Sequence, residues 1–379
     1  MATVYCNPDL TSGDDDGTSE ANAWQTLDQA FNGVAGGDHC YIKKCSSRID
    51  EGGIDVPTGA DGTATAMTIF EGYETTPGDN GRFEYANAIV IKSDMTVFKN
   101  WDMEDSKAST SGVLKVDNSA TAHLHNSRIV NTHSGNYPAV NIAHSMIITQ
   151  SEIIAEGWLT TAQRGAITAN SNDQVIVDGC VIRGYKGVGA TPGVAGFVVT
   201  NNVFYSPTSR SMEYAIEVDF QSSTLEVKTG VIANNTMYLG DGGVNGIQIN
   251  ELPDLSEKSA VFIANNIIWG DGAGSGISNG DTTTTVGPVI MNNATGNWTA
   301  SGGVTGFGAS VASYGNIELT ADPFVDGAYG DFRLNGVSGG GAACRAAAYP
   351  TTFEGLTAGN RKDIGAYGHS GLIERISVS

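Results

Sequence analysis

The sequence predicts an all-β fold, a right-handed single-stranded parallel β-helix (a solenoid) with a short N-terminal capping helix. Three observations support this prediction: a recurring Asn-containing motif, two apolar columns that flank it, and a composition rich in turn-forming residues. Glycine contributes 50 of the 379 residues, and charged residues make up only 16%. Such a composition is typical of many short strands joined by turns.

The recurring motif is an Asn-Asn pair within an apolar stretch, as in VIANNTMYLG (231–240) and FIANNIIWGD (262–271). The first Asn of each clear copy is Asn201, Asn234, Asn265 or Asn292. Weaker copies precede them at Asn100, Asn126, Gln150 and Asp178, and successive copies lie 23 to 33 residues apart. A repeat of this length is typical of a solenoid in which each repeat forms one coil.

Apolar residues occupy two fixed positions around these anchors. The position two residues before the anchor is apolar in all eight copies, and the position three residues after it is apolar in seven. Because these positions are five residues apart, they share one core only if the chain turns a corner between them. Asn tolerates the left-handed backbone that a corner requires, and stacked Asn side chains can hydrogen-bond along the column. We therefore interpret four residues as structural corners rather than as ligand-binding residues: Asn201, Asn234, Asn265 and Asn292.

A second apolar strand precedes several of these corners at a similar distance. The segments are GVLKV (112–116), AVNIA (139–143), GAITA (165–169), YAIEV (214–218) and GIQIN (246–250). Short strands and corners with a constant apolar lining predict parallel coils over residues 46–300. The chirality of parallel crossovers makes the right-handed form the expected one.

The two ends of the chain are expected to close the solenoid. Residues 1–45 contain a strand, an acidic loop and a capping helix, with Asn22 and Gln25 as the predicted N-cap and N3 residues. The apolar face of this helix comprises Trp24, Leu27, Ala30, Phe31 and Val34. Residues 301–379 form a C-terminal closing module and tail, which includes ADPFVDGAYGDFRL (321–334) and AGNRKDIGAYG (358–368).

In the segment VIANNTMYLGDGGVNGIQI and at both termini, the sequence resembles the pectate-lyase-like right-handed parallel β-helix repeat proteins. The opening VYCNPD is similar to phage-encoded virion members of this class that lack a signal peptide. The resemblance covers most of the chain and implies the fold. It implies no single activity, because this fold occurs in lyases, hydrolases, adhesins and virus particle proteins.

The sequence identifies no catalytic residue. The candidate bases hold no common register relative to the anchors: Arg128, Arg164, Arg183, Lys186, Arg210 and Lys228. We interpret Glu217 and Asp219 as a solvated strand face. The six histidines show no metal-binding spacing, and His123, His125 and His133 are interpreted as exposed coil residues.

No cofactor is expected, apart from a weak calcium candidate in the loop SGDDDGTSE (12–20). Its ligands would be Asp14, Asp16 and Glu20, although the loop lacks the full EF-hand pattern. The five cysteines include no C-x-x-C pair, so we expect buried, reduced thiols.

Three aromatic residues are expected to form an interface. Tyr205, Tyr238 and Trp269 lie four residues after successive anchors, on the predicted outward face of neighbouring coils. We expect lateral packing there, either into a homo-oligomer (a trimer first) or onto another virion protein. Two alternatives are stacking on sugar rings and coverage by a loop such as 251–260.

The charge balance excludes one class of partner. With 41 acidic and 20 basic residues, the net charge is -21, which argues against nucleic-acid binding. We find neither a secretion signal nor an apolar run that could insert into a membrane.

The expected function is therefore a non-catalytic structural or adhesive role in a bacteriophage virion, as a capsid decoration or tail-associated protein assembled in the host cytoplasm. Its expected partners are other virion proteins, further copies of itself, or a cell-surface glycan. The alternative is a polysaccharide lyase or glycoside hydrolase, either a phage depolymerase or a secreted extracellular enzyme.

Overall fold

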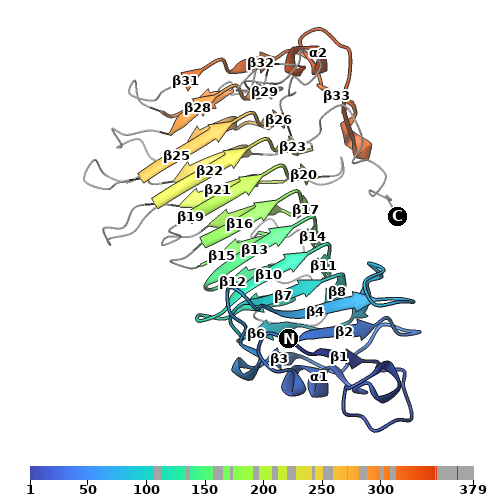
Figure 1. The fold of residues 1–379 in the computed structure, drawn as a ribbon. Coiled ribbons are helices and arrows are strands. Elements are labelled where there is room, and N and C mark those ends of the chain that lie inside the picture. The colour runs from blue at the N-terminus through green and yellow to red at the C-terminus, as the bar shows by residue number, and fades with distance from the viewer. Residues whose placement is uncertain are drawn as a thin grey trace, which may run out of the picture. The chain divides into compact units, whose positions relative to one another are not determined.

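The structure is a computed structural model (Figure 1). It describes residues 1–105, 112–133, 137–156, 165–170, 174–190, 196–206, 212–219, 228–240, 244–250, 259–270, 272–280, 288–298, 303–307, 313–345, 347 and 365. The chain divides into two compact units, Met1–Val175 and Ile176–Ser379.

The first unit consists of three parallel sheets, and its coils place successive strands in sheets A, B and C (Figure 1). Its sheet A contains β1 (Thr3–Cys6), β2 (His39–Lys43), β4 (Thr68–Tyr73), β7 (Thr96–Lys99), β10 (Thr121–His125) and β13 (Ser145–Thr149). Its sheet B contains β5 (Phe83–Tyr85), β8 (Trp101–Asp105), β11 (Arg128–Asn131) and β14 (Glu152–Ala155). Its sheet C contains β3 (Ile54–Val56), β6 (Ile89–Ile91), β9 (Leu114–Val116), β12 (Val140–Ile142) and β15 (Ile167–Ala169).

The second unit repeats this arrangement, and β16 (Gln174–Asp178) lies at the boundary. Its sheet A contains β19 (Gly196–Thr200), β22 (Lys228–Ala233), β25 (Ser259–Ala264), β28 (Val289–Met291) and β31 (Ser313–Tyr314). Its sheet B contains β17 (Val181–Arg183), β20 (Val203–Tyr205), β23 (Thr236–Tyr238), β26 (Ile267–Trp269), β29 (Ala294–Gly296) and β32 (Ile317–Leu319). Its sheet C contains β18 (Lys186–Ala190), β21 (Tyr214–Asp219), β24 (Asn245–Asn250), β27 (Ser275–Asn279) and β30 (Val304–Thr305).

Both units are therefore parallel β-helices, and the expected all-β fold class is confirmed. All five segments predicted as second strands lie in sheet C, as parts of β9, β12, β15, β21 and β24. Alternate residues of each strand point into the core, where aliphatic and aromatic side chains from successive coils stack. The five cysteines are buried, as predicted, and form no disulfide bond.

The first Asn of each pair forms the corner between sheets A and B. The backbone φ angle is 57° at Asn201, 58° at Asn234, 57° at Asn265 and 53° at Asn292, which confirms the predicted left-handed conformation. The weak anchor Asp178 was placed one residue early. Val181 pairs with Val203, which sets Gly179, with φ 66°, at the corner position instead.

The second Asn of each pair forms the hydrogen-bond ladder. The amide nitrogen of Asn202 donates to Asn235 at 3.0 Å, Asn235 donates to Asn266 at 2.9 Å, and Asn266 donates to Asn293 at 2.8 Å. These four side chains are fully buried, and each also donates to a backbone carbonyl. The two roles that we assigned to the first Asn are thus divided between the two residues of the pair.

The capping helix is α1 (Leu27–Gly33), which lies against β1 and β3 at the N-terminal end of the first unit (Figure 1). Leu27, Ala30 and Phe31 of α1 and its C-cap Val34 are buried, as predicted, whereas Trp24 precedes the helix and is half-buried. The predicted N-cap, Asn22, is wrong because it belongs to a separate 3-10 helix, Glu20–Asn22. Thr26 is the N-cap: its hydroxyl accepts from the Gln29 backbone amide and donates to the Gln29 side-chain oxygen.

Replacing Thr26 with alanine is expected to lower the free energy of unfolding by about 1 kcal/mol, because the amide of Gln29 loses its acceptor. Urea denaturation of the purified protein measures this change. Thr26→Ser keeps the hydroxyl and is the matched control, expected to stay close to wild type. Equal losses in both variants would contradict the capping role.

The C-terminal part of the second unit contains an antiparallel hairpin of β33 (Phe324–Asp326) and β34 (Asp331–Leu334), followed by α2 (Gly341–Cys344). A 3-10 helix, Gly327–Tyr329, connects the two strands. The predicted closing segment 321–334 therefore folds as a hairpin, whereas 358–368 lies outside the described residues apart from Gly365. No helix in the described parts of the chain is long and apolar enough to cross a membrane.

Candidate active site on the outer face of sheet A

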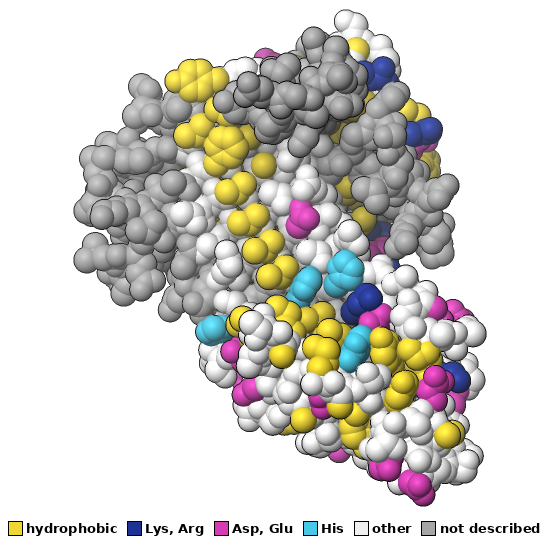
Figure 2. All heavy atoms as spheres, in the orientation of Figure 1, with side chains coloured by type: hydrophobic (Ala, Val, Ile, Leu, Met, Phe, Trp, Pro, Cys, Tyr) yellow, Lys and Arg dark blue, Asp and Glu magenta, His cyan; other side chains and the backbone are white. Residues whose placement is uncertain are grey.

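Two columns of outward-facing side chains cross sheet A of the first unit. Parallel pairing of β2, β4, β7, β10 and β13 places one residue from each strand in register. The first column reads Tyr41, Glu71, Lys99, His125 and Thr149. The second column reads His39, Ile69, Val97, His123 and Ile147. Figure 2 shows histidine side chains beside a Lys or Arg side chain on this face.

Glu71 contacts one residue of each column. Its side chain is only 4% exposed, and its two carboxylate oxygens contact two different nitrogen donors. One oxygen accepts from Lys99 Nζ at 2.7 Å, and the other lies 2.9 Å from His39 Nε2. A buried carboxylate requires such partners, because desolvation disfavours its charge. Glu71 therefore holds an ammonium group and an imidazole at fixed positions on the outer face.

His39 and Tyr41 lie side by side on β2, with ring centroids 4.1 Å apart and nearly parallel planes. Burial lowers the pKa of His39, and the neighbouring Glu71 carboxylate partly offsets this by raising it. Burial raises the pKa of the Tyr41 phenol. At neutral pH the pair consists of a neutral imidazole and a protonated phenol. With Nε2 bound to Glu71, His39 Nδ1 has no hydrogen-bond partner among the described residues.

His123 and His125 converge on one hydroxyl group. His123 Nε2 and His125 Nδ1 each lie 2.9 Å from Thr149 Oγ1. Burial lowers the pKa of both imidazoles, and for His125 the Lys99 charge lowers it further. The interpretation of these two histidines as exposed coil residues is wrong, because both are half-buried and hydrogen-bonded.

The outer face of this sheet carries few acidic side chains. Its outward positions on β2, β4, β7, β10 and β13 hold two lysines, three histidines and one carboxylate: Lys43, Lys99, His39, His123, His125 and Glu71. The chain as a whole has twice as many acidic as basic residues, 41 against 20. The face is therefore a place where an anionic ligand meets little repulsion.

The repeat pattern did not predict that His39, Glu71 and Lys99 meet, because its first anchor was Asn100, after β2 and β4. One feature of the repeat did point to the first column. Lys99, His125 and Thr149 each occupy the position immediately before an anchor, which points outward at the end of a sheet A strand.

The candidate bases from the sequence analysis have other partners. Arg128 contacts Asp102 at 3.1 Å on the outer face of sheet B, and Lys186 contacts Glu217 at 3.0 Å on sheet C. Arg183 stacks over the Tyr205 ring at 5.7 Å. Glu217 also accepts from Asn250, so it belongs to a polar network rather than to a freely solvated face. Outside the described residues or side chains lie Arg164, Arg210, Lys228 and Asp219.

The acidic loop does not bring its candidate calcium ligands together. Asp16 accepts hydrogen bonds from the backbone nitrogen and hydroxyl of Thr18, at 3.0 and 2.7 Å. Across the described parts of the chain, no three His, Cys, Asp or Glu side chains are close enough to hold a metal ion. Calcium binding by Asp14, Asp16 and Glu20 stays a prediction.

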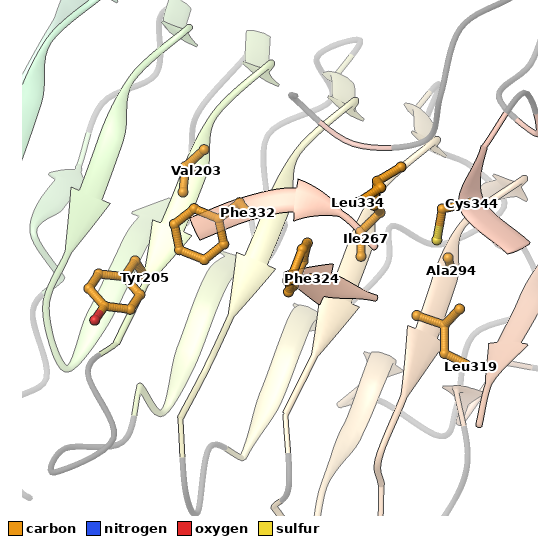
Figure 3. Packing of buried hydrophobic residues seen from close by; sticks show 9 residues of the cluster. All are labelled: Val203, Tyr205, Ile267, Ala294, Leu319, Phe324, Phe332, Leu334 and Cys344. Carbon is orange, nitrogen blue, oxygen red and sulfur yellow. The ribbon is translucent and has the colours of Figure 1, made fainter. Parts of the chain in front are cut away.

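The expected interface is covered by the chain itself (Figure 3). Tyr205 is 7% exposed, its ring lies 5.5 Å from that of Phe332, and its hydroxyl donates to the Ala328 carbonyl. Tyr238 and Trp269 pack against the same cluster. The cluster comprises Val203, Tyr205, Ile267, Ala294, Leu319, Phe324, Phe332, Leu334 and Cys344. The β33–β34 hairpin covers this face, so the expected outward exposure of Tyr205 is wrong. Partner binding by these aromatics stays a prediction, and residues 251–258 of the alternative loop lie outside the described residues.

Comparison with solved structures identifies the fold. The crystal structure of pectate lyase Pel9A matches 98% of this chain and 97% of its own, with a TM-score of 0.58 and 13% sequence identity. The chain has the pectate lyase fold. At this identity the likeness concerns the fold alone, and the predicted resemblance to pectate-lyase-like β-helices is confirmed.

A second, partial match is an AlyGC variant, an alginate lyase of the PL6 family, with a TM-score of 0.31 and 12% identity over 79% of this chain and 53% of that chain. No protein-family model matches the sequence, and neither does any curated protein. The expected phage origin and virion location stay predictions.

Proposed function

We propose that this protein is a polysaccharide lyase that cleaves a polyuronate on the outer face of sheet A in the first unit. The observation that carries the proposal is the arrangement around Glu71, which holds His39 and Lys99 from two neighbouring strands beside Tyr41. The similarity in fold to a pectate lyase supports the same reaction class.

The reaction is a β-elimination. A base removes the proton from C5 of a uronate residue, next to its carboxylate. The electron pair forms a C4=C5 double bond, the C4–O4 bond breaks, and the leaving oxygen takes a proton. No water is consumed. The reaction therefore needs a base, an acid and a cation that stabilises the carboxylate while negative charge develops on it.

The residues around Glu71 match these three needs. His39 is neutral at pH 7, and its Nδ1 is available to act as the base while Nε2 stays bound to Glu71. Tyr41 stays protonated because burial raises its pKa, so its phenol can supply the proton to the leaving oxygen. Lys99 provides a positive charge for the substrate carboxylate, and Glu71 fixes the positions of both His39 and Lys99.

The same face argues against hydrolysis. Glycoside hydrolases with an acid and a nucleophile or base use two carboxyl groups that flank the scissile bond. The outward positions of the five described strands hold only Glu71, and both of its oxygens are paired. The depletion of acid on this face also suits a polyanionic substrate better than a neutral glycan.

Incubation with polygalacturonate, alginate and other polyuronates tests the proposal. We expect one of them to yield unsaturated products, detected by the ultraviolet absorbance of the new C4=C5 bond. Lys99→Met should lower kcat/KM by about 10- to 100-fold, because a charge-assisted contact with the carboxylate is lost. Lys115→Met, on β9 of sheet C, is the matched control and should keep full activity.

Two outcomes would contradict the proposal. One is the absence of unsaturated product from every polyuronate tested with folded protein, which would favour the non-catalytic structural role. The other is release of reducing ends without a double bond, which would indicate a hydrolase.

A further inference from the structure

His123 and His125 form a separate donor group on the same sheet. The two residues are two positions apart on β10, so both side chains point outward from one strand. Thr149 lies directly opposite His125 on β13. The ring centroids of the two histidines are 5.9 Å apart. Neither imidazole contributes to the elimination mechanism described above.

The donor atoms converge on a small volume. His123 Nε2 and His125 Nδ1 each lie 2.9 Å from Thr149 Oγ1. Metal–imidazole bonds are about 2.0–2.1 Å long, so cis ligands at right angles around one ion are about 3.0 Å apart. The nitrogen-to-oxygen distances already match that separation. A tetrahedral ion would require a wider spacing of about 3.4 Å.

The chemistry of the donors selects the ion. Imidazole nitrogens suit late first-row metals such as Cu²⁺, Ni²⁺ and Zn²⁺, whereas Ca²⁺ and Mg²⁺ prefer oxygen ligands. The right-angled donor spacing favours Cu²⁺ and Ni²⁺, and affinity for nitrogen ligands is highest for Cu²⁺. Lys99, the neighbour of His125 in the column, is paired with Glu71, which limits its repulsion of a cation.

We propose that His123, His125 and Thr149 form a binding site for a late first-row divalent metal ion, with water completing the coordination. The site supplies two imidazoles and a hydroxyl, fewer strong ligands than a structural metal centre. It therefore fits an exchangeable ion rather than one required for folding. The proposal does not depend on the lyase activity.

Isothermal titration of tag-free, full-length protein with Cu²⁺, Ni²⁺, Zn²⁺, Ca²⁺ and Mg²⁺ tests the site. We expect one saturable site for Cu²⁺ and Ni²⁺, weaker binding of Zn²⁺, and no saturable binding of Ca²⁺ or Mg²⁺ at the same residues. His123→Gln and His125→Gln should each weaken Cu²⁺ binding at least tenfold. Electron paramagnetic resonance of the Cu²⁺ complex should show coupling to two imidazole nitrogens, reduced to one in either variant.

Three further variants keep the test specific. Thr149→Ser retains the hydroxyl and should bind Cu²⁺ nearly as well as wild type. His39→Gln and His144→Gln change histidines outside the proposed site and should also bind Cu²⁺ nearly as well. Circular dichroism confirms that each variant is folded. Unchanged Cu²⁺ affinity in the His123→Gln/His125→Gln double variant would overturn the proposal. A site lost equally with His39→Gln or His144→Gln would also overturn it, as would the absence of saturable Cu²⁺ or Ni²⁺ binding to wild type.

Discussion

His39→Gln is expected to lower kcat for polyuronate elimination by about 10²- to 10⁴-fold, the usual contribution of a positioned general base. Glutamine can retain a hydrogen bond to Glu71, but its side chain cannot accept the C5 proton at neutral pH. The stack with Tyr41 at 4.1 Å and the contact with Glu71 fix the position of the imidazole. A partly disordered side chain at position 39 would therefore not by itself explain so large a decrease in kcat. Steady-state rates from ultraviolet absorbance give the measurement.

The pH dependence separates a base from a structural residue. A base acts in its neutral form, so the wild-type rate should fall as the pH drops through the pKa of His39, which burial sets below its usual value. The Glu71 carboxylate raises that pKa, so Glu71→Gln should move the acidic limb of the profile to lower pH while lowering the rate. An unchanged acidic limb in Glu71→Gln, or a kcat within twofold of wild type in His39→Gln, would contradict the assignment.

Asn266→Leu is expected to lower the free energy of unfolding by about 3 kcal/mol or more, because several buried polar groups lose their partners. The Asn266 side chain accepts from the backbone and side-chain nitrogens of Asn235, and it donates to Asn293 and to the Ile232 carbonyl. Leucine satisfies none of these groups, and the position is fully buried.

The preceding residue provides the matched comparison. Asn265→Leu changes the corner and places a branched residue at φ 57°, which costs about 1–2 kcal/mol. Asn266→Ser should recover part of the loss, because Ser151 already accepts from a backbone nitrogen of the preceding coil at the equivalent position in the first unit. Denaturant titration of the three variants measures the loss of unfolding free energy in each and so ranks them. A larger loss in Asn265→Leu than in Asn266→Leu would show that the ladder contributes less than the corner.

Much of the fold could be predicted from the sequence, because each coil repeats the same local requirements. A corner needs a residue that tolerates positive φ, and the flanking strands need apolar side chains at fixed offsets. Because those constraints act within a few residues, the repeating sequence pattern shows them directly. Where the signal was weak, as at Asp178, the predicted register was wrong by one residue, and pairing with the next coil decided it.

The candidate site could not be predicted in the same way. Glu71, Lys99 and His39 come from three coils, and the sequence around each of them does not predict that their side chains meet. Their proximity follows from the register of parallel strands, which brings residues 28 to 32 positions apart within hydrogen-bond distance. The same holds for His123 and His125, whose shared partner, Thr149, lies on the next coil.

The sequence by itself determined the repeating coil, its corners and the helix that covers its N-terminal end, because these depend on backbone conformation and apolar periodicity. Only the tertiary structure decided which outward faces are free. The aromatic face of Tyr205, Tyr238 and Trp269 has the pattern of an interface, yet the β33–β34 hairpin, more than fifty residues further along the chain, packs over it. Outward position in a strand is a local property, whereas exposure depends on which distant segment gains by burying its own apolar side chains there.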